Sequence, residues 1–427
     1  MGGGTAAEEN RVVVETERPA TYREVFGVAE FRALFASFLL SMLGDMLTKV
    51  AVAVLVFDRT RSPLLSAAAF ALSYVPWGVG GPVLAALADR WPRRRTLVVC
   101  DLARAGLVAL LALPGMPLPV LLALLVLASL LTPPFEAARS ALMPEVLRGD
   151  RFVVAQSVLM VSSYVVSFGG FVVGGALVSV LRPRGALVVD AVTFAVSGLL
   201  IALYVQHRPV DRGEPRSLLR ETADGLRLVF SHRVLRSYLL LVWAVSALVF
   251  ASEGLAAAYA RHLGAGPTAV GLLLAALPFG LAVGGLILAR AAGPIRRIRL
   301  TIPLATVATI AMLPLMFDPP LPVVLGLYAL SGVGLATAIP LNAMFVRAVA
   351  PAYRGRAFGV ARSGLEVGQG LAVVAAGALA TVLSIPVVIA LFGGVAGTLL
   401  VALIAARWPT VEEQLAAEAA PVGPGGL

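Results

Sequence analysis

Twelve apolar stretches, each bounded by proline, glycine or arginine, follow one another along this chain. Each is about 20 residues long, the length of α-helix that crosses the hydrocarbon core of a bilayer. The stretches lie at approximately 34–57, 64–88, 96–113, 120–138, 153–180, 186–205, 238–260, 268–289, 300–317, 322–346, 357–383 and 386–406. Because backbone polar groups in lipid must be bonded within their own segment, we expect an all-α polytopic membrane protein with twelve transmembrane helices.

The composition excludes several classes of protein. Of the 427 residues, 59% are hydrophobic and 14% are charged, whereas soluble domains have roughly 45–50% and 25%. The single cysteine allows no disulfide, and the three histidines are too scattered for a zinc pair. Lys49, the one lysine, lacks the preceding glycine of a phosphate-binding loop. We therefore expect neither an enzyme nor an ATP-driven pump, and no metal or organic cofactor.

The net charge of +10 reflects an uneven distribution of cations between the loops. Of the 34 basic residues, 26 lie on the side of the two termini, 5 lie in the opposite loops and 3 lie within spans. Basic residues concentrate in cytoplasmic loops, so both termini are expected in the cytoplasm and the protein in the cell membrane. This pattern is typical of membrane topology and not of nucleic-acid binding.

The longest loop, residues 206–237, carries seven arginines and divides the spans six and six. At an offset of 206 positions, eight identities link the two halves around the junctions of spans 4 and 5 and of spans 10 and 11. We therefore expect two pseudo-symmetric six-helix bundles. The predicted parts are an N-terminal tail (1–33), a first bundle (34–205), a linker (206–237), a second bundle (238–406) and a C-terminal tail (407–427).

The turn after the second span has the sequence Ala-Leu-Ala-Asp-Arg-Trp-Pro-Arg-Arg-Arg from residue 86. It resembles the signature loop of the major facilitator superfamily, G-x-x-x-D-R/K-x-G-R/K-R/K. The matching residues are Asp89, Arg90, Arg93 and Arg94, whereas Ala85 and Pro92 stand where the family has glycines. The hydrophobic length is similar to that of the family's twelve-helix transporters.

Three further segments resemble the branch of that family that contains macrolide and enterobactin exporters. They are Ser41-x-x-Gly44-Asp45, Asp101-x-x-Arg104-Ala105 and the segment from Pro134 to Pro144. A fourth segment, from Gly170 to Gly175, is similar to a glycine-rich element of proton-coupled antiporters, with phenylalanine in place of its proline. Glycines there also allow close helix packing, the more ordinary interpretation.

The signature-loop charges suit a latch between the two halves. Asp89 is expected to face the N-terminus of a helix that starts near Arg356, where unpaired N–H groups favour an anion. Arg93 is expected to pair with Glu136 at the end of the fourth span. The alternative is that these charges serve only as topology signals.

Charges inside the spans are the candidates for proton coupling. A charged group near the bilayer centre costs ~2.5–3.5 kcal/mol, so each should face a cavity or a partner. Asp45 and Lys49, and Arg362 and Glu366, are spaced for pairing along one helix face, and Glu253 has no opposite charge within four residues. Asp45, Glu253 and Glu366 are our proton-coupling candidates, with Lys49 and Arg362 as paired cations; the alternative for the two pairs is simple charge neutralisation.

Three other intramembrane charges are given structural interpretations. Asp101 and Arg104 are expected to brace the signature loop, and Asp190 is expected to reach the membrane interface. Aromatic, methionine and amide side chains near mid-span are candidates to line a substrate cavity, although packing is the alternative for each. These are Phe38, Met42, Tyr74, Trp77, Tyr164, Trp243, Phe250, Asn342 and Phe345.

Taken together, these features predict a monomeric secondary transporter of the cell membrane, driven by the proton gradient. The resemblance implies export of a hydrophobic or amphipathic small molecule, drug-like or a secondary metabolite, by proton antiport with alternating access. An importer of a small metabolite is the nearer alternative. A non-transporting membrane receptor or assembly protein is the more distant one.

Overall fold

The computed structural model describes residues 20–74, 76, 91–208, 218–350 and 353–419, and every element in these ranges is helical. A first group of helices packs together in the N-terminal half of the chain. It comprises α1 (Tyr22–Gly27), α2 (Ala29–Thr60), α3 (Pro63–Ala71), α5 (Arg93–Leu111), α6 (Leu118–Leu130), α7 (Thr132–Val146) and α8 (Asp150–Tyr204). The prediction of an all-α protein is confirmed.

A second group packs together in the C-terminal half. It begins with α9 (Leu218–Ser231), α10 (Arg233–Phe250), η2 (Ala251–Leu255), α11 (Ala256–His262), α12 (Pro267–Ala291), α13 (Pro294–Arg299), α14 (Thr301–Ile310) and η3 (Leu313–Phe317). It continues with α15 (Leu321–Leu335), α16 (Ala338–Ala348), α17 (Arg354–Leu379), α18 (Ile385–Ile389), η5 (Ala390–Ala396), α19 (Gly397–Ala405) and α20 (Val411–Ala419).

Seven helical stretches among the described residues are long and apolar enough to cross a membrane, and Thr301–Phe317 is a shorter apolar one. One of the seven, α8, is 55 residues long and holds two of the predicted spans, separated by a left-handed turn at Arg182 (φ 62°) just before Pro183. Helices α5 and α17 are less apolar than these seven because they contain charged residues, although both lie where spans were predicted.

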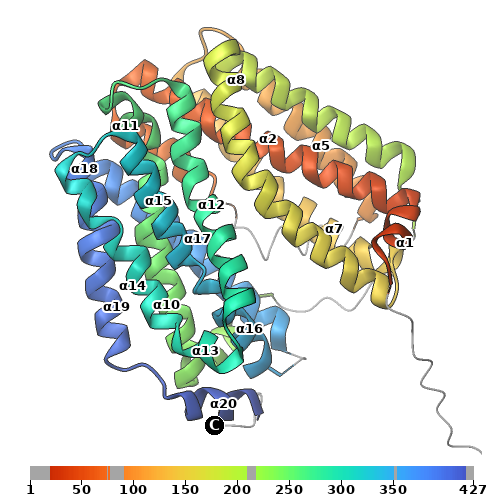
Figure 1. Ribbon diagram of the computed structural model, residues 1–427. Helices are drawn as coiled ribbons and strands as arrows, with labels where there is room; N and C mark the ends of the chain where they lie inside the picture. The colour runs from red at the N-terminus through yellow and green to blue at the C-terminus, as the bar shows by residue number, and fades with distance from the viewer. Residues whose placement is uncertain (1–19, 75, 77–90, 209–217, 351–352, 420–427) are drawn as a thin grey trace, which may run out of the picture.

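The two groups lie side by side and diverge toward one end of the molecule (Figure 1). That end holds both α1 and α20, and we call it the terminal end. The opposite end, near α11 and α18, is called the far end (Figure 1). Across the groups, α8 contacts α12, and α3 contacts α17 and η2.

Glycines make the contact between α8 and α12 possible. A Cβ on Gly175 would lie 2.9 Å from the Cα of Gly271, closer than real Cβ atoms approach. On the face of α8 that meets α2, a Cβ on Gly170 would lie 3.0 Å from the Met46 side chain, and one on Gly174 would lie 3.3 Å from Val50. The glycine-rich element of the fifth span therefore packs α8 tightly against both α2 and the other group.

Candidate functional site

A cavity of about 980 Å³ lies among the helices of the first group, with α17 of the second group contributing to its wall. It reaches from Lys49 and Ser73 to Arg139 and Gln156, near the terminal end. The apolar part of its wall includes Phe38, Met42, Met46, Leu125, Met160 and Phe194. The charged part consists of Asp45, Lys49, Arg104, Glu136, Arg139, Arg362 and Glu366.

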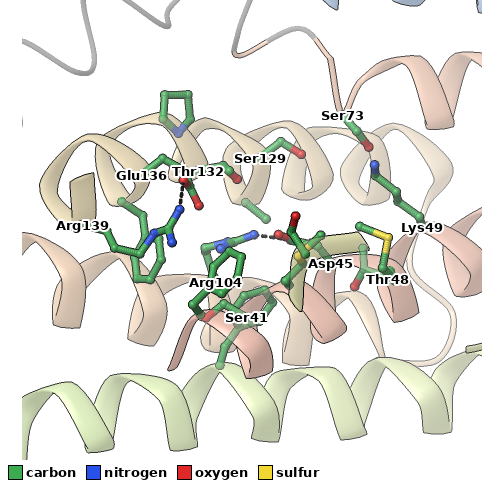
Figure 2. Close-up of a pocket in the computed structure, with 18 of the residues that line it drawn as sticks. Ser41, Asp45, Thr48, Lys49, Ser73, Arg104, Ser129, Thr132, Glu136 and Arg139 are labelled. Atoms are coloured by element: carbon green, nitrogen blue, oxygen red, sulfur yellow. Dashed lines mark hydrogen bonds and ion pairs between the residues drawn. The ribbon is translucent and has the colours of Figure 1, made fainter. Parts of the chain in front are cut away.

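Asp45 forms an ion pair with Arg104, which reaches it from α5 (Figure 2). The Arg104 side chain is only 4% exposed and lies 4.1 Å above the centre of the Phe194 ring, whereas Asp45 is 33% exposed to the cavity. The expected pairing of Asp45 with Lys49 is wrong in this conformation. Lys49 lies one turn farther along α2, while α5 places the guanidinium beside Asp45.

Two more carboxylates lie behind this pair, and both are fully buried. Asp101 accepts hydrogen bonds from Ser41 (3.3 Å) and from Ser197. Asp190 accepts hydrogen bonds from Thr48 and from Thr193 (3.2 Å).

The expectation that Asp190 reaches the interface is therefore wrong. The missing side chain of Gly44 leaves the room that its carboxylate fills, since a Cβ there would collide with it. The role expected for Arg104 also changes, since Arg104 pairs with Asp45 at the cavity.

The charges nearer the terminal end pair within the first group. Glu136 pairs with Arg139 on α7, and Arg93 pairs with Glu145 near the end of the same helix. Arg94 donates to the carbonyl of Ala202. The predicted contact between Arg93 and Glu136 is absent here, because Glu136 lies more than two turns before Glu145 on α7 and faces the cavity.

The second group contributes two carboxylates to the region where the groups meet. Glu366 on α17 pairs with Arg362 (2.7 Å), as their spacing predicts, and both line the cavity. Glu253 lies in the 3₁₀ turn η2 that interrupts the seventh span, and it accepts a hydrogen bond from the Tyr74 hydroxyl of the first group (3.2 Å). Tyr74 lines the cavity and Glu253 lies behind it, 6% exposed.

The structure places the cavity candidates from the sequence in three classes. Phe38, Met42 and Tyr74 line the cavity. Trp77 lies outside the described residues, as do Asp89 and Arg90 of the signature loop.

The remaining candidates lie away from the cavity wall. Trp243 donates to the carbonyl of Ala361 (2.9 Å), and Phe345 is buried against Phe358. Phe250 is partly buried against the core, Tyr164 is half-buried on α8, and Asn342 is exposed on α16.

Sequence reasoning missed Arg104, Asp101 and Asp190 as members of the site. Asp101-x-x-Arg104 was a visible signal, because two opposite charges three residues apart in an apolar span require partners. The hydroxyls that satisfy Asp101 and Asp190 come from α2 and α8, which no local pattern links. Among the residues that the structure describes, no three acidic, histidine or cysteine side chains are grouped to hold a metal ion.

Comparison with known proteins gives one family. The family model described as Major Facilitator Superfamily matches residues 34–259 and 254–425. The multidrug efflux pump Tap of Mycobacterium tuberculosis is 28% identical over 355 residues, which cover 78% of this chain and 82% of Tap. An uncharacterized MFS-type transporter of Bacillus subtilis, YvqJ, is 24% identical over 274 residues, 61% of this chain and just under two thirds (64%) of YvqJ.

Solved structures show the same fold at low sequence identity. A mutant of the nucleoside transporter NupG is matched with a TM-score of 0.71 and 15% identity, over 89% of this chain and 100% of that one. A bacterial homolog to the human lysosomal transporter Spinster, in an inward-facing and unoccupied conformation, is matched with a TM-score of 0.67 and 13% identity. That match covers 95% of this chain and 100% of the other.

Proposed function

The chain belongs to the major facilitator superfamily, and from that membership we propose that it exports a hydrophobic or amphipathic small molecule in exchange for protons. It is a multi-pass membrane transporter and not an enzyme. The observation that carries the proposal is the cavity of about 980 Å³, in which apolar side chains surround paired charges. A volume of this order is at the upper end of sites for drug-sized ligands.

We propose that both termini, and with them the terminal end, face the cytoplasm. The excess of basic residues on that side supports this orientation. Residues 34–205 and 238–406 are then the two rocking halves, joined by the cytoplasmic linker 206–237, with tails at 1–33 and 407–427. The cavity, extending toward the cytoplasm, belongs to an inward-open state of a monomeric transporter of the cell membrane.

The proposed coupling groups are Asp45, Glu253 and Glu366, of which Asp45 pairs with Arg104 and Glu366 pairs with Arg362. Two of the three carboxylates line the cavity, and Tyr74 links the third to its wall. A proton taken up by one of them changes the charge that must be held inside the membrane, and thereby the balance between inward-open and outward-open states. The driving force is the proton gradient, with no organic cofactor.

The proposed latch consists of Asp89, Arg90, Arg93, Arg94 and Glu136. Arg93 and Glu136 pair with other residues of the first group in this conformation. We propose that the contact between the halves, made by Asp89 at the helix that starts near Arg356, forms in the outward-open state, in which the cytoplasmic ends of the halves approach each other. The Asp89→Asn variant is then expected to slow turnover more than it weakens binding.

Two alternatives make different predictions. An importer moves a polar metabolite into whole cells by symport. A receptor or assembly protein moves nothing, so neutralising Asp45, Glu253 and Glu366 together changes no flux. The 28% identity to a multidrug efflux pump favours export over both.

The deciding experiment uses everted membrane vesicles from cells that overproduce the full chain. Under the export proposal, a pH gradient drives uptake of a lipophilic cation, a macrolide or an amphipathic acid, and the triple variant Asp45→Asn, Glu253→Gln, Glu366→Gln abolishes it. If no gradient drives uptake into these vesicles while a polar solute enters whole cells, export is wrong.

A further inference from the structure

Lys49 is the single lysine of the chain, and the other 33 basic residues are arginines. A chain that uses arginine everywhere else has kept the compact, strongly hydrated ammonium at one position inside a transmembrane helix. That position lines the cavity, at the end where α2 approaches the second group. The choice of lysine therefore calls for a chemical reason at this place.

The ammonium of Lys49 lies on an aromatic surface. Its Nζ is 5.7 Å from the centre of the Phe70 ring and 5.9 Å from that of Tyr74, within the range of cation–π attraction. It points toward Ser73, whose hydroxyl lines the same corner of the cavity (Figure 2). We call Lys49, Ser73 and Tyr74 the lysine corner.

The carboxylates near the lysine corner are already engaged. Asp45 pairs with Arg104, and Glu366 pairs with Arg362. Glu253 accepts a hydrogen bond from the Tyr74 hydroxyl. The tyrosine whose ring lies near the Lys49 ammonium therefore also binds Glu253 behind the cavity wall. All three acids remain within electrostatic range of Lys49, which helps the membrane interior to tolerate its charge.

In the described part of the chain, no carboxylate lies within 4.0 Å of the Lys49 ammonium. The ammonium has three N–H donors, and the face turned to the cavity is open to an incoming acceptor. The described cavity wall as a whole holds four cations and three carboxylates, and Lys49 is the cation in excess.

We propose that the lysine corner binds the anionic group of an amphipathic acid, whose apolar part lies along Phe38, Met42 and Met46. This inference rests on the proposed function and narrows its substrate class. An oxyanion would gain charge-assisted hydrogen bonds from Lys49 without displacing any existing ion pair. A cationic substrate would have to displace Arg104 from Asp45, Arg139 from Glu136 or Arg362 from Glu366 to pair with a carboxylate of the wall.

The test compares two fluorescent probes that differ by one charge, dansyl-undecanoic acid and its methyl ester, on the purified full-length protein. The wild type is expected to bind the acid at least about tenfold more tightly than the ester. Lys49→Gln is expected to lower the affinity for the acid to that for the ester, and to leave the affinity for the ester unchanged. Lys49→Arg, which keeps the charge, retains a preference for the acid.

The matched control is Arg59→Gln, which removes one positive charge from an exposed position of the same helix. It should leave the ratio of the two affinities unchanged. Equal binding of acid and ester by the wild type overturns the proposal, and so does undiminished acid binding by Lys49→Gln. If Lys49→Gln does not fold, Lys49→Met takes its place. The ratio of the wild-type affinities for acid and ester tests the proposal even if neither variant folds.

The two proposals fail in different ways. Acid binding without transport driven by a pH gradient supports the lysine corner and contradicts export. Transport of the lipophilic cation tetraphenylphosphonium, with acid and ester bound equally, leaves export standing and overturns the lysine corner.

Discussion

Asp58 and Arg261 join the two groups of helices at the far end of the molecule. The Arg261 guanidinium, at the end of α11, lies 2.6 Å from a carboxylate oxygen of Asp58, near the end of α2. Both side chains are about half exposed, at 52% and 41%. Together with the glycine contact between α8 and α12, this ion pair joins the two groups away from the terminal end, where they diverge.

Breaking the pair of Asp58 and Arg261 should slightly favour separation of the two groups of helices at the far end. Exposed ion pairs contribute about 0.2–1 kcal/mol, so Asp58→Asn is expected to shift the equilibrium between closed and open far ends by at most about fivefold. Distances between spin labels at Arg59→Cys and Leu383→Cys, in a Cys100→Ala background, report this shift. Arg233→Gln is the control, because its partner Glu413 lies in the same group; an equal shift in that variant would contradict the role of Asp58.

The glycine contact between α8 and α12 should tolerate no side chain. Gly271→Ala places a Cβ against the backbone of Gly175, so the helices must move apart, and we expect a loss of about 1–3 kcal/mol in stability. Gly169→Ala on α8 is the matched control, because its Cβ meets nothing within 4 Å. Thermal unfolding in detergent compares the two. Equal melting temperatures of the two variants would show that the stability of the protein does not depend on the close contact between α8 and α12.

Most of the fold was predictable from the sequence because bilayer thickness sets the length of every span. The predicted spans agree with described helices, apart from the second span, whose later part lies outside the described residues. The break at Arg182 was placed correctly because Pro183 cannot continue the preceding helix.

The site was less predictable, because its contacts join helices that are distant in sequence. The spacing rule found the pair of Arg362 and Glu366, which lies within one helix. It gave Asp45 the wrong partner, since Arg104 is 59 residues away. Asp190 was misplaced for a similar reason, because the room for it comes from Gly44 on another helix.

Arg104 should be the most costly of the site's cations to remove. Arg104→Gln leaves the Asp45 carboxylate without its ion-pair partner and removes a cation near buried Asp101 and Asp190. Losing one partner of a fully buried pair costs about 3–5 kcal/mol. Asp45 is one-third exposed to the cavity, so we expect a smaller loss of stability that is still seen as a drop in melting temperature.

A second substitution tests that explanation. Adding Asp45→Asn to Arg104→Gln removes the unpaired charge, so the double variant should be more stable than Arg104→Gln alone. Arg347→Gln, which breaks an exposed pair with Glu418, should cost less than about 1 kcal/mol. A double variant that is no more stable than Arg104→Gln would mean that Arg104 acts through packing on Phe194 and not through its charge.

Glu253 should connect transport to the pH gradient without binding the substrate itself. Its carboxylate lies behind Tyr74 and outside the cavity wall, so Glu253→Gln should leave the affinity for substrate nearly unchanged. The amide cannot take up and release a proton, and an acid whose charge changes inside the membrane is what links the gradient to the conformational equilibrium. In proteoliposomes, Glu253→Gln should therefore exchange substrate across the membrane but no longer accumulate it when a pH gradient is imposed.

Two companion variants separate this role from a structural one. Tyr74→Phe keeps the carboxylate and removes the hydroxyl that bonds to it, so accumulation should persist with a changed dependence on pH. Glu413→Gln makes the same chemical change on α20, outside the predicted spans, and should leave accumulation as in the wild type. Because Glu253 joins η2 of one half to Tyr74 of the other, gain or loss of its proton changes a contact between the halves. Normal proton-driven accumulation by Glu253→Gln would remove it from the mechanism and leave Asp45 and Glu366 as the coupling groups.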